Sequence, residues 1–186
     1  MVASIALALG KKVRLVYQDE ARFGRLPVIR RAWCPHGFRP KIKAAITRQF
    51  KYIYGAVDVM YGTLCHMTFD QMNTENMGVF LDYVSKQYPD DIILMVLDGA
   101  SSHTTGKLRV PENMHLQTLP PYSPELNPVE QLWRHLRTHG CGNRYFNTLQ
   151  EVVQTVEVEL EALKKVPQKV VNMFYWPSIQ EASKAS

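Results

Sequence analysis

Three carboxylates in this sequence occupy positions from which they could share metal ions. Asp19 follows the mostly apolar residues 13–18, Asp98 follows the uniformly apolar residues 92–97, and Glu130 begins a helical pattern. Hard divalent cations need oxygen ligands from rigid elements, and paired cations stabilise the attacking and leaving oxygens of an in-line displacement at phosphorus. We therefore expect these three side chains to bind two Mg²⁺ or Mn²⁺ ions and to catalyse phosphoryl transfer.

The segment at residues 119–133 fixes the place of Glu130. We expect the residues that precede the helix to be extended, because Pro120, Pro121 and Pro124 lie within five residues of one another. Asn127 is suited to cap a helix and Pro128 to open it, since a proline at the first helical position has no N–H to lose. Glu130 is therefore expected in the first turn of that helix.

Each carboxylate also has an ordinary interpretation. Asp98 and Gly99 form a turn dipeptide, Glu130 stands where a capping-box glutamate belongs, and Asp19 beside Glu20 could be a solvated strand end. Adjacent side chains of a strand point to opposite faces of the sheet. Only one of the two neighbours should therefore enter the site, and we expect it to be Asp19.

Positive charge is concentrated in one segment of the chain. The net charge is +5, and residues 21–57 hold nine of the 22 Lys and Arg residues and no Asp or Glu. Such a segment favours binding to a polyanion, with interleaved aromatic residues that could stack on bases or belong to the core. A solvated edge strand is the alternative. The expected DNA contacts are Arg22, Arg30, Arg31, Trp33, Arg39, Lys41, Lys43 and, from a later loop, His103.

Other features argue against competing classes of protein. Three cysteines at unrelated spacings imply free thiols and a reducing, cytoplasmic compartment. The apolar residues 2–9 are too short to span a bilayer and lack a preceding positive charge, so neither membrane anchor nor signal peptide is expected. His135, His139 and Cys141 have spacing suited to zinc, but the glutamate of a zinc-protease motif is missing, and a helix end explains them better.

The order of elements specifies a mixed α/β fold. Strands are expected at residues 13–18, 44–60, 63–69, 92–97 and 115–119, and helices at 74–88, shortly after Ser101, at 128–138 and from Thr148. This order predicts a mixed five-stranded sheet flanked by helices, with a crossover before the central strand. It matches the ribonuclease H-like fold, in which the first and fourth strands are adjacent, so Asp19 and Asp98 would meet.

Four blocks of this sequence resemble the DDE transposases of bacterial insertion sequences related to mariner elements, also called DDE superfamily endonucleases. The blocks are QDEARF around Asp19, RAWCPHGFRP after it, LDGASSH around Asp98, and PPYSPELNPVEQLW around Glu130. The last block is close to diagnostic. The resemblance implies that these three carboxylates are the catalytic triad. Gly99 departs from the family pattern, which usually has Asn there, so hydrogen bonding around the second aspartate is expected to differ.

The length of the chain bears on its partners. Family members normally carry helix-turn-helix domains before the catalytic core, so we interpret residues 1–186 as a single ribonuclease H-like catalytic domain without one. Its core would be about 13–140 and its C-terminal helical segment 141–186. The chain is then either a fragment or one product of an element whose separate reading frame supplies a helix-turn-helix protein. The other expected partners are transposon-end and target DNA, and further copies of the chain in a homodimer or higher assembly.

The resulting hypothesis is a DNA endonuclease and strand-transferase that cleaves DNA and joins 3′ ends in transposition. Two alternatives stay open. A decayed or domesticated DNA-binding remnant would bind DNA without cutting it, and a ribonuclease H-type hydrolase would prefer RNA–DNA hybrids. Without metal, the clustered negative charges of Asp19, Asp98 and Glu130 should repel one another, so we expect the pKa of at least one of these three carboxyls to be raised.

Overall fold

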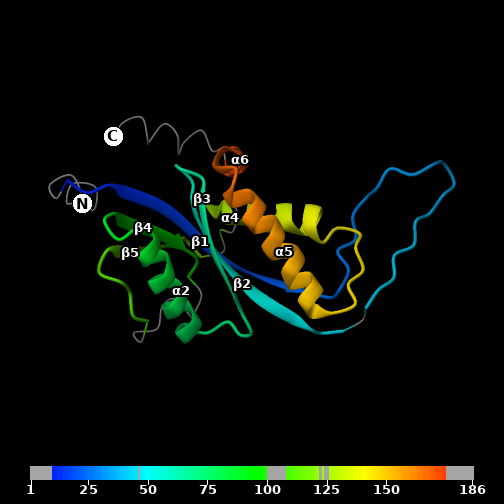
Figure 1. Cartoon of the computed structure of the whole chain (residues 1–186), viewed down its shortest axis with the longest axis horizontal. Helices are drawn as coiled ribbons and strands as arrows, with labels where there is room; N and C mark the ends of the chain where they lie inside the picture. Colours follow the sequence, from blue (N-terminus) through cyan, green and yellow to red (C-terminus); the bar gives the residue numbers. More distant parts are fainter. Residues whose placement is uncertain (1–9, 46, 100–107, 122, 124–125, 175–186) are drawn as a thin grey trace.

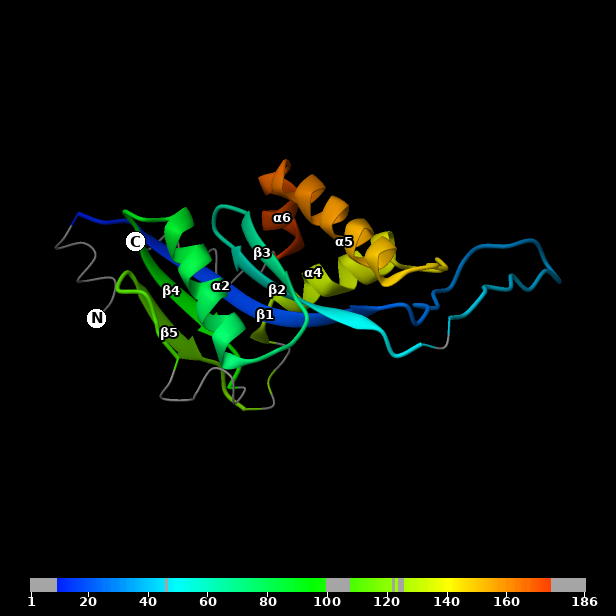
Figure 2. The same cartoon turned by 60° about the horizontal axis from the view of Figure 1, so that its bottom comes forward.

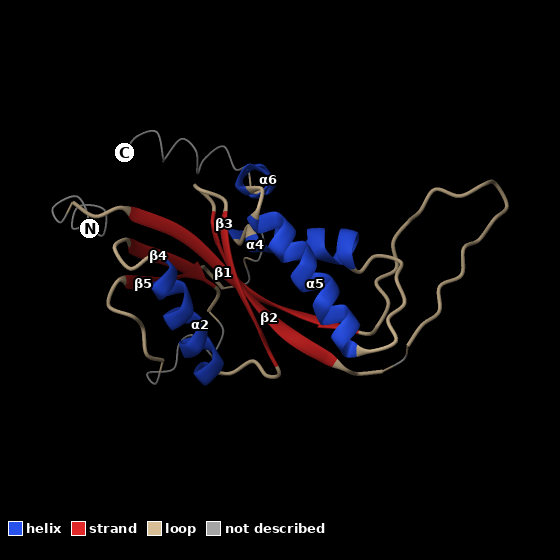
Figure 3. Ribbon diagram, in the orientation of Figure 1, coloured by secondary structure: helices blue, strands red, loops and turns tan. Residues whose placement is uncertain are grey.

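A five-stranded mixed sheet forms the centre of the molecule (Figure 1, Figure 3). The computed structural model describes residues 10–45, 47–99, 108–121, 123 and 126–174. The strands are β1 (Val13–Gly24), β2 (Phe50–Asp58), β3 (Thr63–Phe69), β4 (Ile92–Leu97) and β5 (Met114–Thr118), in the order β3-β2-β1-β4-β5. The β1–β4 and β4–β5 pairs are parallel, and the other two pairs are antiparallel. The first and fourth strands are therefore neighbours, as expected.

Strand β1 is longer than the sequence suggested. Its parallel pairing with β4 ends at Tyr17 opposite Val96, but its antiparallel pairing with β2 continues to Gly24 opposite Phe50. The expected strand end at residue 18 was wrong, because β2 continues to pair with the β1 backbone beyond that residue. Asp19 lies inside a strand, at the level where the neighbouring β4 stops.

The connection from β1 to β2 is a long loop at residues 25–49. It projects away from the sheet in both views (Figure 1, Figure 2). A strand was expected from residue 44, whereas β2 begins at Phe50. The base of the loop is attached to the body by an isolated β-bridge between Val28 and Gly142. Arg30 N donates a hydrogen bond to Asn143 Oδ1 at 2.8 Å, and Asn143 N donates to Val28 O at 2.9 Å.

Helices cover both faces of the sheet (Figure 2). Helix α2 (Thr74–Gln87) packs on one face, and α4 (Val129–His135), η2 (Leu136–Gly140, a π-helical turn), α5 (Leu149–Lys164) and α6 (Pro167–Met173) pack on the other. The capping box at Thr148 is present, since its Oγ1 accepts from Glu151 N at 3.2 Å. No helix in the described ranges is long and apolar enough to cross a membrane. The short helix expected after Ser101 falls outside the described residues.

Candidate active site

Alternation along β1 turns Asp19 toward α4. Tyr17, Ala21 and Phe23 pack with the cluster that includes α4 and α5, whereas Val16 packs with the cluster of α2. Asp19 shares the parity of the first group, so its carboxylate faces α4. Glu20 has the opposite parity, and its charge helps to raise the pKa of Tyr54, a residue of the α2 cluster, to about 12, after the larger effect of burial. Only Asp19 of the two neighbours therefore faces α4.

Trp133 holds the Asp19 carboxylate in place. Its indole Nε1–H donates to Asp19 Oδ2 at 2.8 Å, and the ring itself is 1% exposed. The indole lies over Gly55, the β2 residue opposite Asp19. A Cβ at Gly55 would lie 2.6 Å from the Trp133 Cη2 atom, so no other residue fits there without displacing the ring. Sequence reasoning assigned no role to Gly55 or Trp133. The spacing of Trp133, three residues after Glu130, was the available signal because it predicts a shared helix face.

Asn127 ties the start of α4 to β1. Its Nδ2 donates to Gln18 O at 2.9 Å, and its Oδ1 accepts from Val129 N at 3.1 Å. The helix begins at Val129, one residue later than expected, so the N-cap is Pro128 and not Asn127, and that position has no side-chain cap hydrogen bond. Asn127 contacts the first helical N–H from one residue further out. Gln18 and Asn127 are both buried, and the hydrogen bond between them fixes the start of the helix against the residue that precedes Asp19. The proline-rich segment thus brings a helix end to β1.

Glu130 lies in the first turn of α4, and its side chain is exposed. It is close enough to Asp19 for its charge to act on that carboxyl. The pKa of Asp19 is raised to about 7, mainly by burial; the Trp133 N–H lowers it, and the charges of Glu130 and Glu20 raise it. One carboxyl is thus raised, as expected, but burial contributes more than repulsion. Metal-free Asp19 therefore exchanges a proton near neutral pH.

Asp98 directly follows β4 and is exposed. The parallel register pairs Tyr17 with Val96, and continuing it by two residues brings Asp98 level with Asp19. Neighbouring strands are about 4.8 Å apart, so the two backbones are close at this level. His103 lies outside the described residues, and so does most of the segment that follows Gly99.

Two sets of side chains are candidates for metal binding: the three carboxylates and the set of His135, His139 and Cys141. Among the described residues, no group of three or more His, Cys, Asp or Glu side chains is placed to hold a metal ion. Asp19, Asp98 and Glu130 are therefore not gathered into such a group in the metal-free chain, and neither is the alternative zinc set. In the zinc set the rings of His135 and His139 stack at 4.2 Å, and His139 Nδ1 lies 3.1 Å from His135 O. The cysteines are free, as expected, with Cys34 exposed and Cys65 and Cys141 buried.

The basic segment divides into a loop part and a sheet part. Six of the expected DNA contacts lie in the loop at residues 25–49, and all six are exposed: Arg30, Arg31, Trp33, Arg39, Lys41 and Lys43. Arg22 is instead in β1 and is also exposed. The aromatic residues divide in the same way, since Trp33 and Phe38 are exposed whereas Phe23 and Tyr54 are buried. Phe23 and Tyr54 therefore belong to the core, and stacking on bases stays a prediction for Trp33 and Phe38.

The chain is similar in sequence or in fold to several known proteins. A rhizobial relative, "Uncharacterized protein y4pE/y4sA" of Sinorhizobium fredii (strain NBRC 101917 / NGR234), is 34% identical over 123 residues, which are 66% of this chain and 91% of that protein. The Mos1 mariner paired-end complex with Mn has a TM-score of 0.63 at 17% identity, covering 87% of this chain and 53% of that one. The Mos1 strand transfer complex has a TM-score of 0.60 at 15% sequence identity, and the match covers 87% of this chain and 52% of that one.

These matches define the fold and the family. The chain spans about half the length of the Mos1 chains that it matches. The structural similarity confirms the expected ribonuclease H-like fold. The family model described as "DDE superfamily endonuclease" matches residues 14–153, which include Asp19, Asp98 and Glu130. The chain therefore belongs to the DDE superfamily endonucleases.

Proposed function

We propose that this chain is the catalytic domain of a transposase that cuts DNA and joins 3′ ends with the help of two Mg²⁺ or Mn²⁺ ions. The observation that carries the proposal is the environment of Asp19. Asp19 is a partly buried carboxylate on the α4 face of β1, fixed by Trp133, and burial and the charge of Glu130 raise its pKa, so its ionised form is costly to the fold. Cation binding would offset that cost.

In this proposal Asp19 is the fixed ligand and the other two carboxylates are adjustable. Asp98 and Glu130 are both exposed, so side-chain rotation could turn them toward Asp19 from β4 and from α4. Three carboxylate groups are the donor set that Mg²⁺ and Mn²⁺ prefer. When bound, such ions polarise the phosphate and stabilise the attacking and leaving oxygens.

The residues of the chain would position the reaction rather than form covalent bonds. Water or a 3′-hydroxyl would attack phosphorus in line, and the bond from phosphorus to the leaving 3′-oxygen would break. Asp19, whose pKa is raised to about 7 without cations, would lose its proton when cations bind. Because Trp133 donates to Oδ2, the other oxygen of Asp19 remains the better ligand atom.

DNA binding by this chain would come mainly from the exposed basic loop at residues 25–49. Phosphate contacts by Lys and Arg give affinity that falls with salt and depends little on sequence. Recognition of particular transposon ends would then require a helix-turn-helix segment or protein, and concerted cutting of two ends would require further copies of the chain. The salt dependence should flatten when Arg30, Arg31, Lys41 and Lys43 are neutralised together.

The test is cleavage of duplex DNA, with and without transposon ends, in Mg²⁺, Mn²⁺, Ca²⁺ or EDTA. Asp19→Asn, Asp98→Asn and Glu130→Gln should each abolish cleavage in Mg²⁺ at nearly constant side-chain volume. Glu20→Gln is the matched control, because this carboxylate adjoins Asp19 but faces the other side of the sheet. DNA binding without cutting in any cation would favour the decayed remnant. Preferential cutting of RNA–DNA hybrids would favour the ribonuclease H-type hydrolase.

A further inference from the structure

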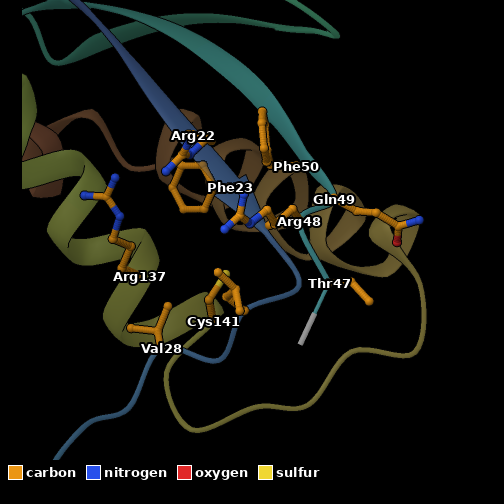
Figure 4. Close-up of a pocket in the computed structure, with 11 residues that line it drawn as sticks. Arg22, Phe23, Val28, Thr47, Arg48, Gln49, Phe50, Arg137 and Cys141 are labelled. Carbon is orange, nitrogen blue, oxygen red and sulfur yellow. The ribbon is translucent and has the colours of Figure 1, made fainter. Parts of the chain in front are cut away.

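A cavity of about 600 Å³ lies where the β1–β2 hairpin meets the end of η2 (Figure 4). Its polar walls include Arg22, Arg48 and Arg137, and its aromatic walls are Phe23 and Phe50. The three guanidinium groups come from three segments that are distant in sequence: β1, the loop that precedes β2, and η2. This volume lies within the range of small-molecule sites and suits a single nucleotide.

The cavity is strongly positive. None of the described residues that line it is an Asp or a Glu. Two of its arginines lie over its aromatic rings, with Arg22 Cζ at 4.7 Å from the Phe50 ring centre and Arg137 Cζ at 5.5 Å from that of Phe23. A guanidinium that lies over a ring keeps N–H groups at its edge for an anion. The cavity therefore combines anion donors with an aromatic surface.

An unsatisfied polar atom in the cavity wall also indicates a ligand. The Thr47 hydroxyl oxygen is buried and has no hydrogen-bond partner in the described part of the chain. Buried hydroxyls are normally hydrogen-bonded, because an unmade bond is costly. An oxygen or nitrogen atom of a ligand would provide the missing partner.

Two elements lead from the candidate active site to this cavity. Arg22 is three residues beyond Asp19 on β1, about 10 Å along the strand, and by alternation its side chain leaves the opposite face of the sheet, where it lies over Phe50. Arg137 is seven residues beyond Glu130, about 10 Å along the helix axis. Seven residues are close to two helical turns, so the two side chains lie on the same face of the helix. The cavity therefore lies at the end of the β1–β2 hairpin, with walls from both faces of the sheet and about two helical turns from Glu130, within reach of a nucleotide close to the one being cut.

We propose that this cavity binds one unpaired nucleotide of the DNA strand that passes through the active site, with its base on Phe50 and its phosphate on Arg48 and Arg137. The inference rests on the proposed function, because the strand is placed by the carboxylates. A recess with an aromatic wall suits a base removed from the helix, whereas duplex phosphates need only an open basic surface. Ends with a single-stranded extension are therefore the preferred substrates.

The test measures binding without cleavage, by fluorescence anisotropy in EDTA. Three probes share one duplex: a blunt form, a form with a short single-stranded 3′ extension, and the same extension with abasic positions. Wild-type protein should bind the extended duplex about tenfold more tightly than either other probe, as expected for stacking of a single base. Phe50→Leu should remove most of this preference. Arg48→Gln and Arg137→Gln should each weaken binding to the extended duplex more than binding to the blunt one.

Arg134→Gln is the matched control, because it removes the same charge from α4, one turn before Arg137, outside the cavity. This variant should weaken binding to all three probes equally. Equal wild-type affinity for the three probes, or equal effects of Arg134→Gln and Arg137→Gln, would overturn the inference. So would competition by a free deoxynucleoside monophosphate as strong as that of the extended duplex, since the site would then serve free nucleotides. Thermal melting of each variant establishes that it is folded.

Failure of this inference can be separated from failure of the proposed function. Asp19→Asn should keep the preference for extended duplex, since the cavity does not include Asp19. Preference without cleavage in any cation would refute the proposed activity but keep the nucleotide site. Cleavage that depends on the three carboxylates, without any preference, would refute only the nucleotide site.

Discussion

Replacing Asp19 by Asn should stabilise the metal-free protein at neutral and alkaline pH. Asn has nearly the same volume as Asp and can still accept the hydrogen bond from Trp133 Nε1 through its own oxygen. What it removes is a carboxylate that burial and the neighbouring Glu130 make unfavourable when ionised. A candidate catalytic residue would thus be a source of instability that is relieved by losing its charge.

The magnitude and pH window follow from the pKa of Asp19. Its pKa rises from 3.8 to about 7 on folding, so the unfolded chain releases this proton at lower pH than the folded one. The free energy of unfolding of the wild type should therefore fall as pH rises from about 4 to about 7, and level off above. Three pKa units correspond to about 4 kcal/mol, but partial solvent access reduces this, and we expect about 2 kcal/mol.

Urea unfolding in EDTA at pH 4.5, 6 and 8 measures this effect. The advantage of Asp19→Asn over wild type should grow between pH 4.5 and pH 8 to about 2 kcal/mol, or several degrees in Tm. Other titrating groups, such as His66, are common to both proteins and cancel. Asp82→Asn, an exposed carboxylate on α2, controls for general charge effects. An advantage that does not change with pH, or a variant less stable than wild type at pH 8, would refute the reasoning.

Three further outcomes follow from the same structure. Trp133→Phe removes the N–H donor to Asp19 and should weaken Mg²⁺ binding about tenfold or more, measured as the cation concentration that half-protects against thermal unfolding. Asn127→Ala breaks the bond to the Gln18 carbonyl and leaves it buried, so the free energy of unfolding should fall by about 1–3 kcal/mol in urea titrations. His66 has a pKa lowered to about 4 by burial and by Lys164, so stability should be lost as pH falls from about 6.5 toward 4; His66→Gln should lessen this loss. A His66→Gln protein as acid-sensitive as wild type would contradict the last expectation.

Periodicity and turn chemistry predicted most of the sheet because they are local signals. The uniformly apolar β4 and the Thr148 capping box each reflect a backbone requirement within a few residues. The true extent of β1 was not predictable in this way. Its continuation to Gly24 depends on pairing with β2, which lies some 30 residues later in the chain, and the sequence around Asp19 does not encode that partner.

For the candidate site, the sequence predicted the helical position of Glu130 but not the residues that support Asp19. The position of Glu130 in the first turn of a helix was predictable because capping and proline chemistry are local. The role of Gly55 was not, because a glycine inside a strand has several explanations, and only the register with Asp19 shows that Trp133 needs the space. The arginine-lined cavity likewise joins three distant segments that no periodicity connects.

The most direct test of the account is a crystal structure with Mn²⁺ and DNA, using anomalous scattering to locate the metal. The account predicts two peaks about 3.5–4 Å apart, contacted by Asp19, Asp98 and Glu130, with Trp133 still donating to Asp19. Peaks at other residues, or any of the three carboxylates more than about 10 Å from both others in the DNA-bound state, beyond the reach of shared ions, would contradict it.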